Sequence, residues 1–295
     1  MKKNWIAHIF LFGAALIYGA NYSIAKIVLD GEYISPMGLV FFRVLTAAFI
    51  FFLFHSLYIK EKVAKEDYLK LLMVSLFGVA INQSLFIIGL KHTVPINAAL
   101  LLTIVPILVF VFSSILLKER VSNRKILGIS LGFFGVLIII LNKGKIILSY
   151  ETLKGDFLVF LNSVSYALYL VKVKPLLSKY NPITVTKWIF LFGLIFIIPL
   201  GFTGAISANW AEFTPKVFTA FLYVLLFTTV LAYLFNIIAL KKVNPSVVGV
   251  YVYLQPILAT LVALLIGKDS LNWIKIIAGI LIFTGVYLVS ETKKV

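Results

Sequence analysis

The chain alternates long apolar runs with short polar segments along its whole length. Runs of about 20 residues suit a hydrocarbon core roughly 30 Å thick. Ten such runs cover residues 5–28, 36–58, 69–90, 95–117, 126–142, 155–173, 185–204, 217–240, 246–266 and 273–290. Each run is predicted to be a helix, because unpaired backbone is costly in lipid and the runs lack the alternation of barrel strands. The pattern predicts an all-α integral membrane protein with ten transmembrane helices.

Composition supports this class of protein. Hydrophobic residues make up 62% of the chain and charged residues 13%, against about 25% charged residues in soluble domains. The first run is longer than the apolar part of a signal peptide, so we expect an uncleaved first helix. The sequence has no cysteine, which excludes disulfides and thiolate metal sites.

The net charge of +16 raises the question of a nucleic-acid partner. The basic residues, however, lie in short segments between apolar runs, which is the pattern of membrane proteins. We therefore expect a lipid bilayer around the chain and no bound nucleic acid. Lysine and arginine gather in the segments that share a side with the N-terminus, so both termini are predicted to lie in the cytoplasm.

The second half of the chain repeats the first at an offset of 150 residues, without a gap. The identical pairs are Leu90-Lys91 with Leu240-Lys241, Pro95 with Pro245, Pro106-Ile107-Leu108 with Pro256-Ile257-Leu258, Lys118 with Lys268, Lys125-Ile126 with Lys275-Ile276, Leu131 with Leu281, Phe133 with Phe283, and Gly135-Val136 with Gly285-Val286. We predict two repeats, at residues 5–142 and 155–290, each with five spans. An odd number of spans inserts the second repeat upside down, and inverted repeats around a central site are typical of secondary transporters.

The loop charges agree with inversion. The first copy carries Lys118, Arg120, Arg124 and Lys125 in a predicted cytoplasmic loop. The second copy has Lys268, Ser270, Ile274 and Lys275 at these positions, so two charges are lost where the loop is predicted to face out. Lys118 and Lys268 are therefore expected on opposite faces of the membrane.

Several motifs resemble the EamA unit, the repeat of the drug/metabolite transporter superfamily. They are Gly89-Leu90-Lys91-His92-Thr93, Ala98-Ala99-Leu100, Pro106, Lys118-Glu119-Arg120, Gly128 and Gly135, together with Tyr18-Gly19-Ala20-Asn21, Arg43 and Ser165-Tyr166-Ala167. The resemblance implies export or exchange of small metabolites, often amino acids, across the bacterial inner membrane. Tyr18 and Tyr166 stand where family members often have tryptophan, and Asp269 where the second unit often has glutamate.

Polar residues deep in an apolar span are costly, so each is a candidate for function. Asn82 and Gln83 lie midway along the third run. At the repeat offset Gln83 aligns with Tyr233, and Phe86 aligns with Asn236. These side chains are predicted to form donors and acceptors around a substrate. Interhelical hydrogen bonding is the alternative.

The leading spans of the two repeats carry a matching polar set, with Asn21 in the first run and Tyr166 in the sixth, near Asn162 and Tyr169. We expect Tyr166 at the transport pathway because it lies deep in its span. Tyrosines near span ends usually belong to the interfacial aromatic belt. That role is predicted for Tyr22, Tyr58, Tyr223 and Tyr287.

Pro106 and Pro256 fall near the middle of the fourth and ninth runs. A mid-helix proline removes a backbone hydrogen bond and clashes with the carbonyl four residues back, here that of Leu102 or Val252. Kinks are predicted at both places, and the freed carbonyls could face a central cavity. Simple packing bends are the alternative. Gln255 and Tyr251 are the predicted polar neighbours of this site.

Arg43 is the only basic residue well inside a run, so it must face protein or water. It could neutralise a substrate carboxylate, or it could tie helices together. The second interpretation is favoured, because the residue resembles a framework position of the family. No aspartate or glutamate lies centrally in a run. We therefore expect facilitated diffusion or exchange, unless protons use an unusual carrier.

Three classes of function remain. A metabolite carrier for neutral or zwitterionic solutes such as amino acids, as a monomer or homodimer without cofactor or metal, is the main prediction. A membrane enzyme is disfavoured because the sequence lacks a buried acid pair, a nucleophile–base set and a metal motif. A non-transporting receptor, scaffold or lipid-handling protein is the third possibility, and it is weakened by the absence of soluble appendages.

Overall fold

The computed structural model describes residues 5–143, 149–265 and 272–291. Within these residues the chain is helical and forms no strand. Ten helices are long and apolar enough to cross a membrane, so the predicted all-α membrane fold is confirmed. Lys268 and Ser270 of the loop comparison, and Asp269 of the family resemblance, lie outside the described residues.

The elements are α1 (Trp5–Asp30), α2 (Pro36–Phe54), η1 (His55–Ile59), η2 (Lys65–Asp67), α3 (Tyr68–Ser75), η3 (Leu76–Ile81), α4 (Asn82–His92), α5 (Pro95–Leu102), α6 (Val105–Leu116), α7 (Asn123–Lys143), α8 (Tyr150–Lys179), α9 (Pro182–Ile206), η4 (Trp210–Glu212), α10 (Pro215–Leu222), η5 (Tyr223–Leu231), α11 (Ala232–Lys242), α12 (Pro245–Val250), η6 (Tyr251–Tyr253), α13 (Leu254–Leu265) and α14 (Trp273–Ser290). Several of them join end to end into single membrane spans, for instance from Lys65 to His92 and from Pro215 to Lys242.

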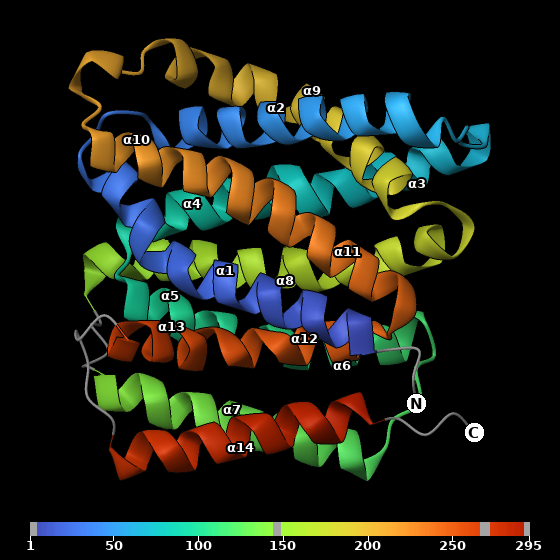
Figure 1. The fold of residues 1–295 in the computed structure, drawn as a ribbon, viewed down its shortest axis with the longest axis vertical. Helices are drawn as coiled ribbons and strands as arrows, with labels where there is room; N and C mark the ends of the chain where they lie inside the picture. Colours follow the sequence, from blue (N-terminus) through green and yellow to red (C-terminus); the bar gives the residue numbers. More distant parts are fainter. Residues whose placement is uncertain (1–4, 144–148, 266–271, 292–295) are drawn as a thin grey trace.

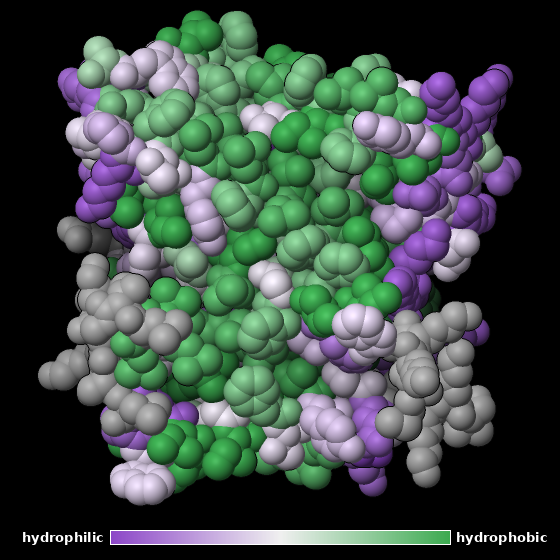
Figure 2. All heavy atoms as spheres, in the orientation of Figure 1, coloured by the Kyte–Doolittle hydropathy of each residue, from purple (hydrophilic) through white to green (hydrophobic). Residues whose placement is uncertain are grey.

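The helices lie side by side and run between two ends of the molecule (Figure 1). The start of α1 and the end of α14 lie at the same end (Figure 1), which we call the terminal face; the other end is the opposite face. Figure 2 shows a broad hydrophobic band across the middle of the bundle, with hydrophilic residues gathered along both margins. This distribution fits a protein whose middle faces lipid and whose two ends face water.

The contacts between helices repeat when each helix is replaced by the one five spans later. α1 packs on α11 and α13, and correspondingly α8 packs on α4 and α6. Other large contacts join corresponding spans of the two halves: α2 with α9, α7 with α14, and α6 of the fourth span with α12 of the ninth. The main helix contacts of one half therefore recur in the other.

Both halves interrupt regular helix at corresponding places. The third span widens into the π-helical η3, and the eighth into the π-helical η5. The fourth span breaks between the end of α5 at Leu102 and the start of α6 at Val105, just before Pro106. The ninth span changes to the 3₁₀ segment η6 just before Pro256. Short π-helical segments are frequent at functional sites, which directs attention to the residues around them.

The small residues of α7 and α14 pack against each other inside the chain. A Cβ added to Gly285 would lie 2.5 Å from the Gly128 carbonyl oxygen and 2.7 Å from the Gly132 nitrogen. Real atoms do not approach so closely, so only glycine allows these two helices their present separation. These glycines therefore have a structural role in this contact.

Candidate functional site

A cavity lies at the centre of the bundle, where seven membrane spans of the two halves meet. The space open to the centre of a water molecule is about 90 Å³, enough for roughly six to nine water molecules. Its walls are formed by Tyr18, Asn21, Tyr22, Arg43, Asn82, Gln83, Phe86, Leu102, Val105, Asn162, Tyr166, Tyr233, Val252 and Gln255. The cavity therefore combines aromatic and apolar walls with a few polar groups, as small-molecule sites do.

The interrupted helices bring their residues to this cavity. Leu102 ends α5 and Val252 lies in η6, so both breaks border the cavity at equivalent positions of the two halves. The π-helical η3 ends just before Asn82 and Gln83, and η5 ends just before Tyr233 and its neighbour Ala232. The irregular backbone thus surrounds the same space, where it is buried in protein rather than exposed to lipid.

The structure brings together most of the residues that the sequence analysis selected. Those lining the cavity are Asn21, Arg43, Asn82, Gln83, Tyr166, Tyr233 and Gln255. Asn236 and Tyr251 lie elsewhere, along a second space of about 10 Å³ that also touches Tyr18, Tyr166 and Gln255. This second space borders Leu11 and Ala14 of α1, so it lies between the cavity and the terminal face.

Two of these amides hold helices together. Asn162 on α8 donates to the Asn82 carbonyl oxygen at 2.8 Å, and Asn82 on α4 donates back to the Asn162 carbonyl oxygen at 3.4 Å. The Tyr233 hydroxyl donates to the Gly78 carbonyl oxygen at 2.7 Å. These groups shape the cavity wall while their hydrogen-bonding capacity is largely used within the protein.

Tyr22 corrects one expectation. It was assigned to the aromatic belt, but its side chain is 9% exposed and lines the cavity. Its hydroxyl donates to Oε1 of Gln255 at 2.8 Å, and its ring meets Phe86 edge to face. The belt interpretation is wrong for this residue.

Tyr18 was not among the predicted site residues, although it lines both spaces. A signal was available, because Tyr18, Asn21 and Tyr22 are spaced by three and four residues and so share one helix face. That face of α1 supplies three neighbouring wall residues of the cavity.

Arg43 ties two helices and also lies at the cavity. Its Nε donates to the Thr229 hydroxyl at 2.9 Å, which ties α2 to η5. The same side chain lines the cavity while being 4% exposed. The residue thus ties two helices and also places a guanidinium group at the cavity wall.

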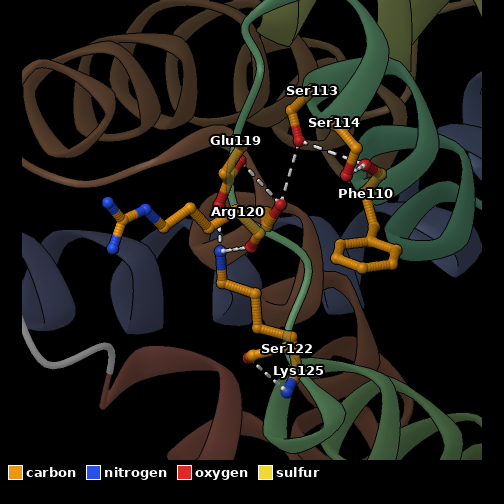
Figure 3. A network of polar contacts seen from close by, with 8 residues as sticks. Phe110, Ser113, Ser114, Glu119, Arg120, Ser122 and Lys125 are labelled. Atoms are coloured by element: carbon orange, nitrogen blue, oxygen red, sulfur yellow. Dashed lines mark hydrogen bonds and ion pairs between the residues drawn. The ribbon is translucent and has the colours of Figure 1, made fainter.

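The bundle is closely tied at the terminal face. Glu119 accepts hydrogen bonds from Lys125 at 2.8 Å and from Ser246 at 2.9 Å, and Ser113 and Ser246 share another at 3.0 Å (Figure 3). These bonds join the end of α6 and the start of α7 to the start of α12. Nearer the second space, Nδ1 of His8 and the Tyr251 hydroxyl are hydrogen-bonded at 2.8 Å.

A separate cluster ties the opposite face. Asp156 near the start of α8 accepts from the Thr93 hydroxyl at 2.5 Å and from the Asn97 amide at 3.1 Å. α4 and α8 also approach closely here. A Cβ added to Gly155 of α8 would lie 2.6 Å from the carbonyl carbon of His92, the last residue of α4. Both ends of the fourth span are therefore fixed to helices of the second half.

Sequence comparison matches these helices with a known family. The model of the EamA-like transporter family matches residues 5–141 and 153–291. The chain belongs to the EamA-like transporter family. The matches cover both halves, and the resemblance seen in the sequence is confirmed. EamA-like proteins form a transporter family, so this membrane protein is a member of a family of transporters.

Similar proteins extend along the whole chain. An uncharacterized transporter of Archaeoglobus fulgidus is 30% identical over 98% of this chain and 99% of its own length. The uncharacterized transporter YyaM of Bacillus subtilis is 25% identical over 99% of this chain and 96% of its own. A crystal structure with 16% identity superimposes with a TM-score of 0.75 over 98% of both chains. This last similarity concerns the fold alone.

Proposed function

We propose that this EamA-like protein is a carrier that exports or exchanges small metabolites, amino acids or related neutral and zwitterionic solutes, through its central cavity. The observation that carries the proposal is the cavity itself, enclosed by spans of both halves at the two helix breaks. Ligand sites of transporters are often built from such discontinuous helices near the middle of the membrane.

The depth of the cavity supports this function. Asn21 lies 16 residues beyond Trp5, which at 1.5 Å per residue is roughly 24 Å from the start of α1. Gln255 lies 10 residues beyond Pro245, or roughly 15 Å from the start of its span at the same face. Asp30, at the other end of α1, is 9 residues beyond Asn21, or roughly 14 Å away. A solute in the cavity would therefore lie well inside the bundle as seen from either face.

Alternating access follows from the proposed arrangement of two inverted repeats. The repeated helix contacts and the paired breaks are what two copies of one unit, inserted in opposite senses, would produce. A carrier of this kind converts between two conformations, one with the cavity open to the first face and one with it open to the other. In this conformation the central cavity has a volume of about 90 Å³. The second space, toward the terminal face, has only about 10 Å³.

Location and coupling complete the proposal. We place the protein in the bacterial inner membrane with the terminal face in the cytoplasm, as a monomer or homodimer that uses no cofactor or metal and has no enzymatic activity. Among the residues described around the cavity there is no aspartate, glutamate or histidine. Intramembrane proton relays commonly use those side chains, so we expect exchange or facilitated diffusion.

Counterflow in proteoliposomes tests the carrier function. Vesicles containing the purified protein and a high internal concentration of one amino acid are diluted into a trace of the same labelled amino acid, and the twenty amino acids are tested in turn. A carrier accumulates label transiently, whereas a receptor, scaffold or lipid-handling protein does not. If no amino acid gives accumulation above protein-free vesicles, carriage of amino acids is refuted.

A further inference from the structure

The polar groups of the cavity differ in whether they have hydrogen-bond partners. Asn82, Asn162 and the Gln255 oxygen are paired within the protein. In contrast, Nη1 of Arg43, both amide atoms of Gln83 and Oδ1 of Asn21 are buried and have no hydrogen-bond partner among the described residues. Arg43, Gln83 and Asn21 are 4%, 1% and 3% exposed, and all three line the same cavity.

Such groups are rare in folded proteins, because a buried donor or acceptor without a partner loses its hydration without compensation. The Tyr233 hydroxyl lies beside Gln83, but it donates to the Gly78 carbonyl oxygen at 2.7 Å and to Oδ1 of Asn82 at 3.4 Å, and no hydrogen bond of acceptable geometry joins it to Gln83. Exchanging the assigned oxygen and nitrogen of Gln83 leaves the conclusion unchanged, because one donor and one acceptor are unpaired in either orientation. A ligand with an acceptor and a donor would satisfy them.

The charge of the cavity defines the ligand further. A guanidinium group stays protonated in proteins, and Nε of Arg43 has only the neutral Thr229 hydroxyl as partner. No carboxylate is among the described residues that line the cavity. None of the ion pairs formed by the described residues includes Arg43. The cavity thus holds one buried positive charge to which the described part of the chain offers no counter-ion.

We infer that Arg43 and the Gln83 amide nitrogen bind the carboxylate of the solute, while the oxygens of Gln83 and Asn21 accept hydrogen bonds from its amino group. The inference rests on the proposed transport function and specifies its substrate class as zwitterionic amino acids. Arginine is suited to carboxylates because its planar fork can donate two parallel hydrogen bonds. The cavity, at about 90 Å³, has room for a small solute only.

A binding experiment separates the carboxylate from the rest of the ligand. The purified full chain is heated with each of the twenty standard amino acids, and those that raise its melting temperature are compared with two analogues. The amide analogue lacks the carboxylate, and the deaminated acid lacks the amino group; inorganic phosphate serves as the test for a general anion site. We expect the amide to bind at least about tenfold more weakly than the amino acid, and the deaminated acid to bind more weakly as well.

Variants test whether Arg43 and Gln83 bind the carboxylate of the solute. Arg43→Gln should abolish the shift in melting temperature given by the best amino acid, and Arg43→Lys should retain a smaller one. Since Arg43→Gln also removes the bond to Thr229, Gln83→Glu provides a second variant that keeps this bond. Its carboxylate would occupy the anion position beside Arg43, so the protein should stay folded and lose at least about tenfold in affinity. Thr228→Val is the control, because this buried threonine bonds only to its own helix, at Val224, and binding should be unchanged.

Several results would overturn the inference. These are no stabilisation by any amino acid, binding of the amide within twofold of the amino acid, tighter binding of phosphate than of any carboxylate, or full affinity in folded Arg43→Gln or Gln83→Glu protein. Counterflow of the same solutes distinguishes the two proposals. Carboxylate-dependent binding without exchange of label refutes transport and leaves the site standing, whereas exchange that is equally fast for Arg43→Gln refutes the site and leaves transport standing.

Discussion

The hydroxyl of Tyr22 on α1 donates a 2.8 Å hydrogen bond to Oε1 of Gln255 on α13. This bond joins the first span of one half to the broken span of the other, directly at the cavity wall. Tyr22→Phe should leave the Gln255 oxygen without its donor and lower the stability of the protein by about 1 kcal/mol. Thermal unfolding of the purified variant measures this change, and the rate of counterflow should change with it.

Tyr58→Phe is the control for this substitution. Its side chain is 72% exposed, so removal of its hydroxyl should leave both stability and counterflow at the level of the unmodified protein. Equal melting temperatures for Tyr22→Phe and Tyr58→Phe would show that the Tyr22–Gln255 bond contributes nothing measurable.

Glu119 and Lys125 form an ion pair whose side chains are only 6% and 4% exposed. Glu119→Gln removes one charge and leaves the Lys125 ammonium buried without its counter-ion. A loss of roughly 3–5 kcal/mol is expected, because an unpaired buried charge is costly. The double variant Glu119→Gln/Lys125→Met should recover most of this loss, since neither charge remains.

Thermal unfolding of Glu119→Gln, Lys125→Met and the double variant gives the coupling energy between these two residues. Additive effects of the two substitutions would contradict a coupled pair. Any change in the bond from Ser246 to residue 119 is common to Glu119→Gln and the double variant, so it does not account for a difference between them.

The contact between α7 and α14 predicts opposite effects of two similar substitutions. Gly285→Ala places a methyl group 2.5 Å from the Gly128 carbonyl oxygen, so the helices must move apart. A loss of about 1–3 kcal/mol is expected for such overpacking. Gly279→Ala meets only the flexible end of Ile257, at 2.9 Å, and alanine favours helix by up to about 1 kcal/mol. Melting temperatures should fall for the first variant and stay equal or rise for the second; the reverse order would contradict the packing.

The ten spans could be predicted from the sequence because lipid allows few alternatives. About 20 apolar residues are needed to cross the hydrocarbon core, and a helix satisfies their backbone. The breaks of spans four and nine were indicated by Pro106 and Pro256, since proline removes a helix hydrogen bond wherever it stands inside a helix. These features depend on local chemistry and on the membrane, and both can be recognised without tertiary structure.

The state of individual polar atoms could not be predicted in this way. Asn82 and Gln83 are adjacent and equally polar, yet Asn82 is bonded to α8 and Gln83 is unpaired in the cavity. The difference depends on which neighbour each side chain meets across the bundle. Tyr22 was misplaced for a similar reason: it lies near the end of its span, but it shares a helix face with Tyr18 that turns toward the cavity.

The inverted arrangement predicts that equivalent loops lie on opposite sides of the membrane. The chain contains no cysteine, so single-cysteine variants can be labelled without background. In intact cells, an impermeant maleimide should label Lys268→Cys and spare Lys118→Cys until the membrane is permeabilised. Labelling of both residues, or of neither, in intact cells would contradict two repeats of opposite orientation.

Leu102 and Val252 border the cavity from the two helix breaks, and single cysteines there show whether one cavity serves both faces. The purified variants are placed in liposomes and exposed to an impermeant maleimide from outside or from inside, with and without an amino acid that gives counterflow. We predict that each cysteine reacts from both sides, and that the amino acid protects it in both cases. Reaction from one side only, or reaction from both sides that the transported amino acid leaves unaffected, would contradict a carrier with a central alternating site.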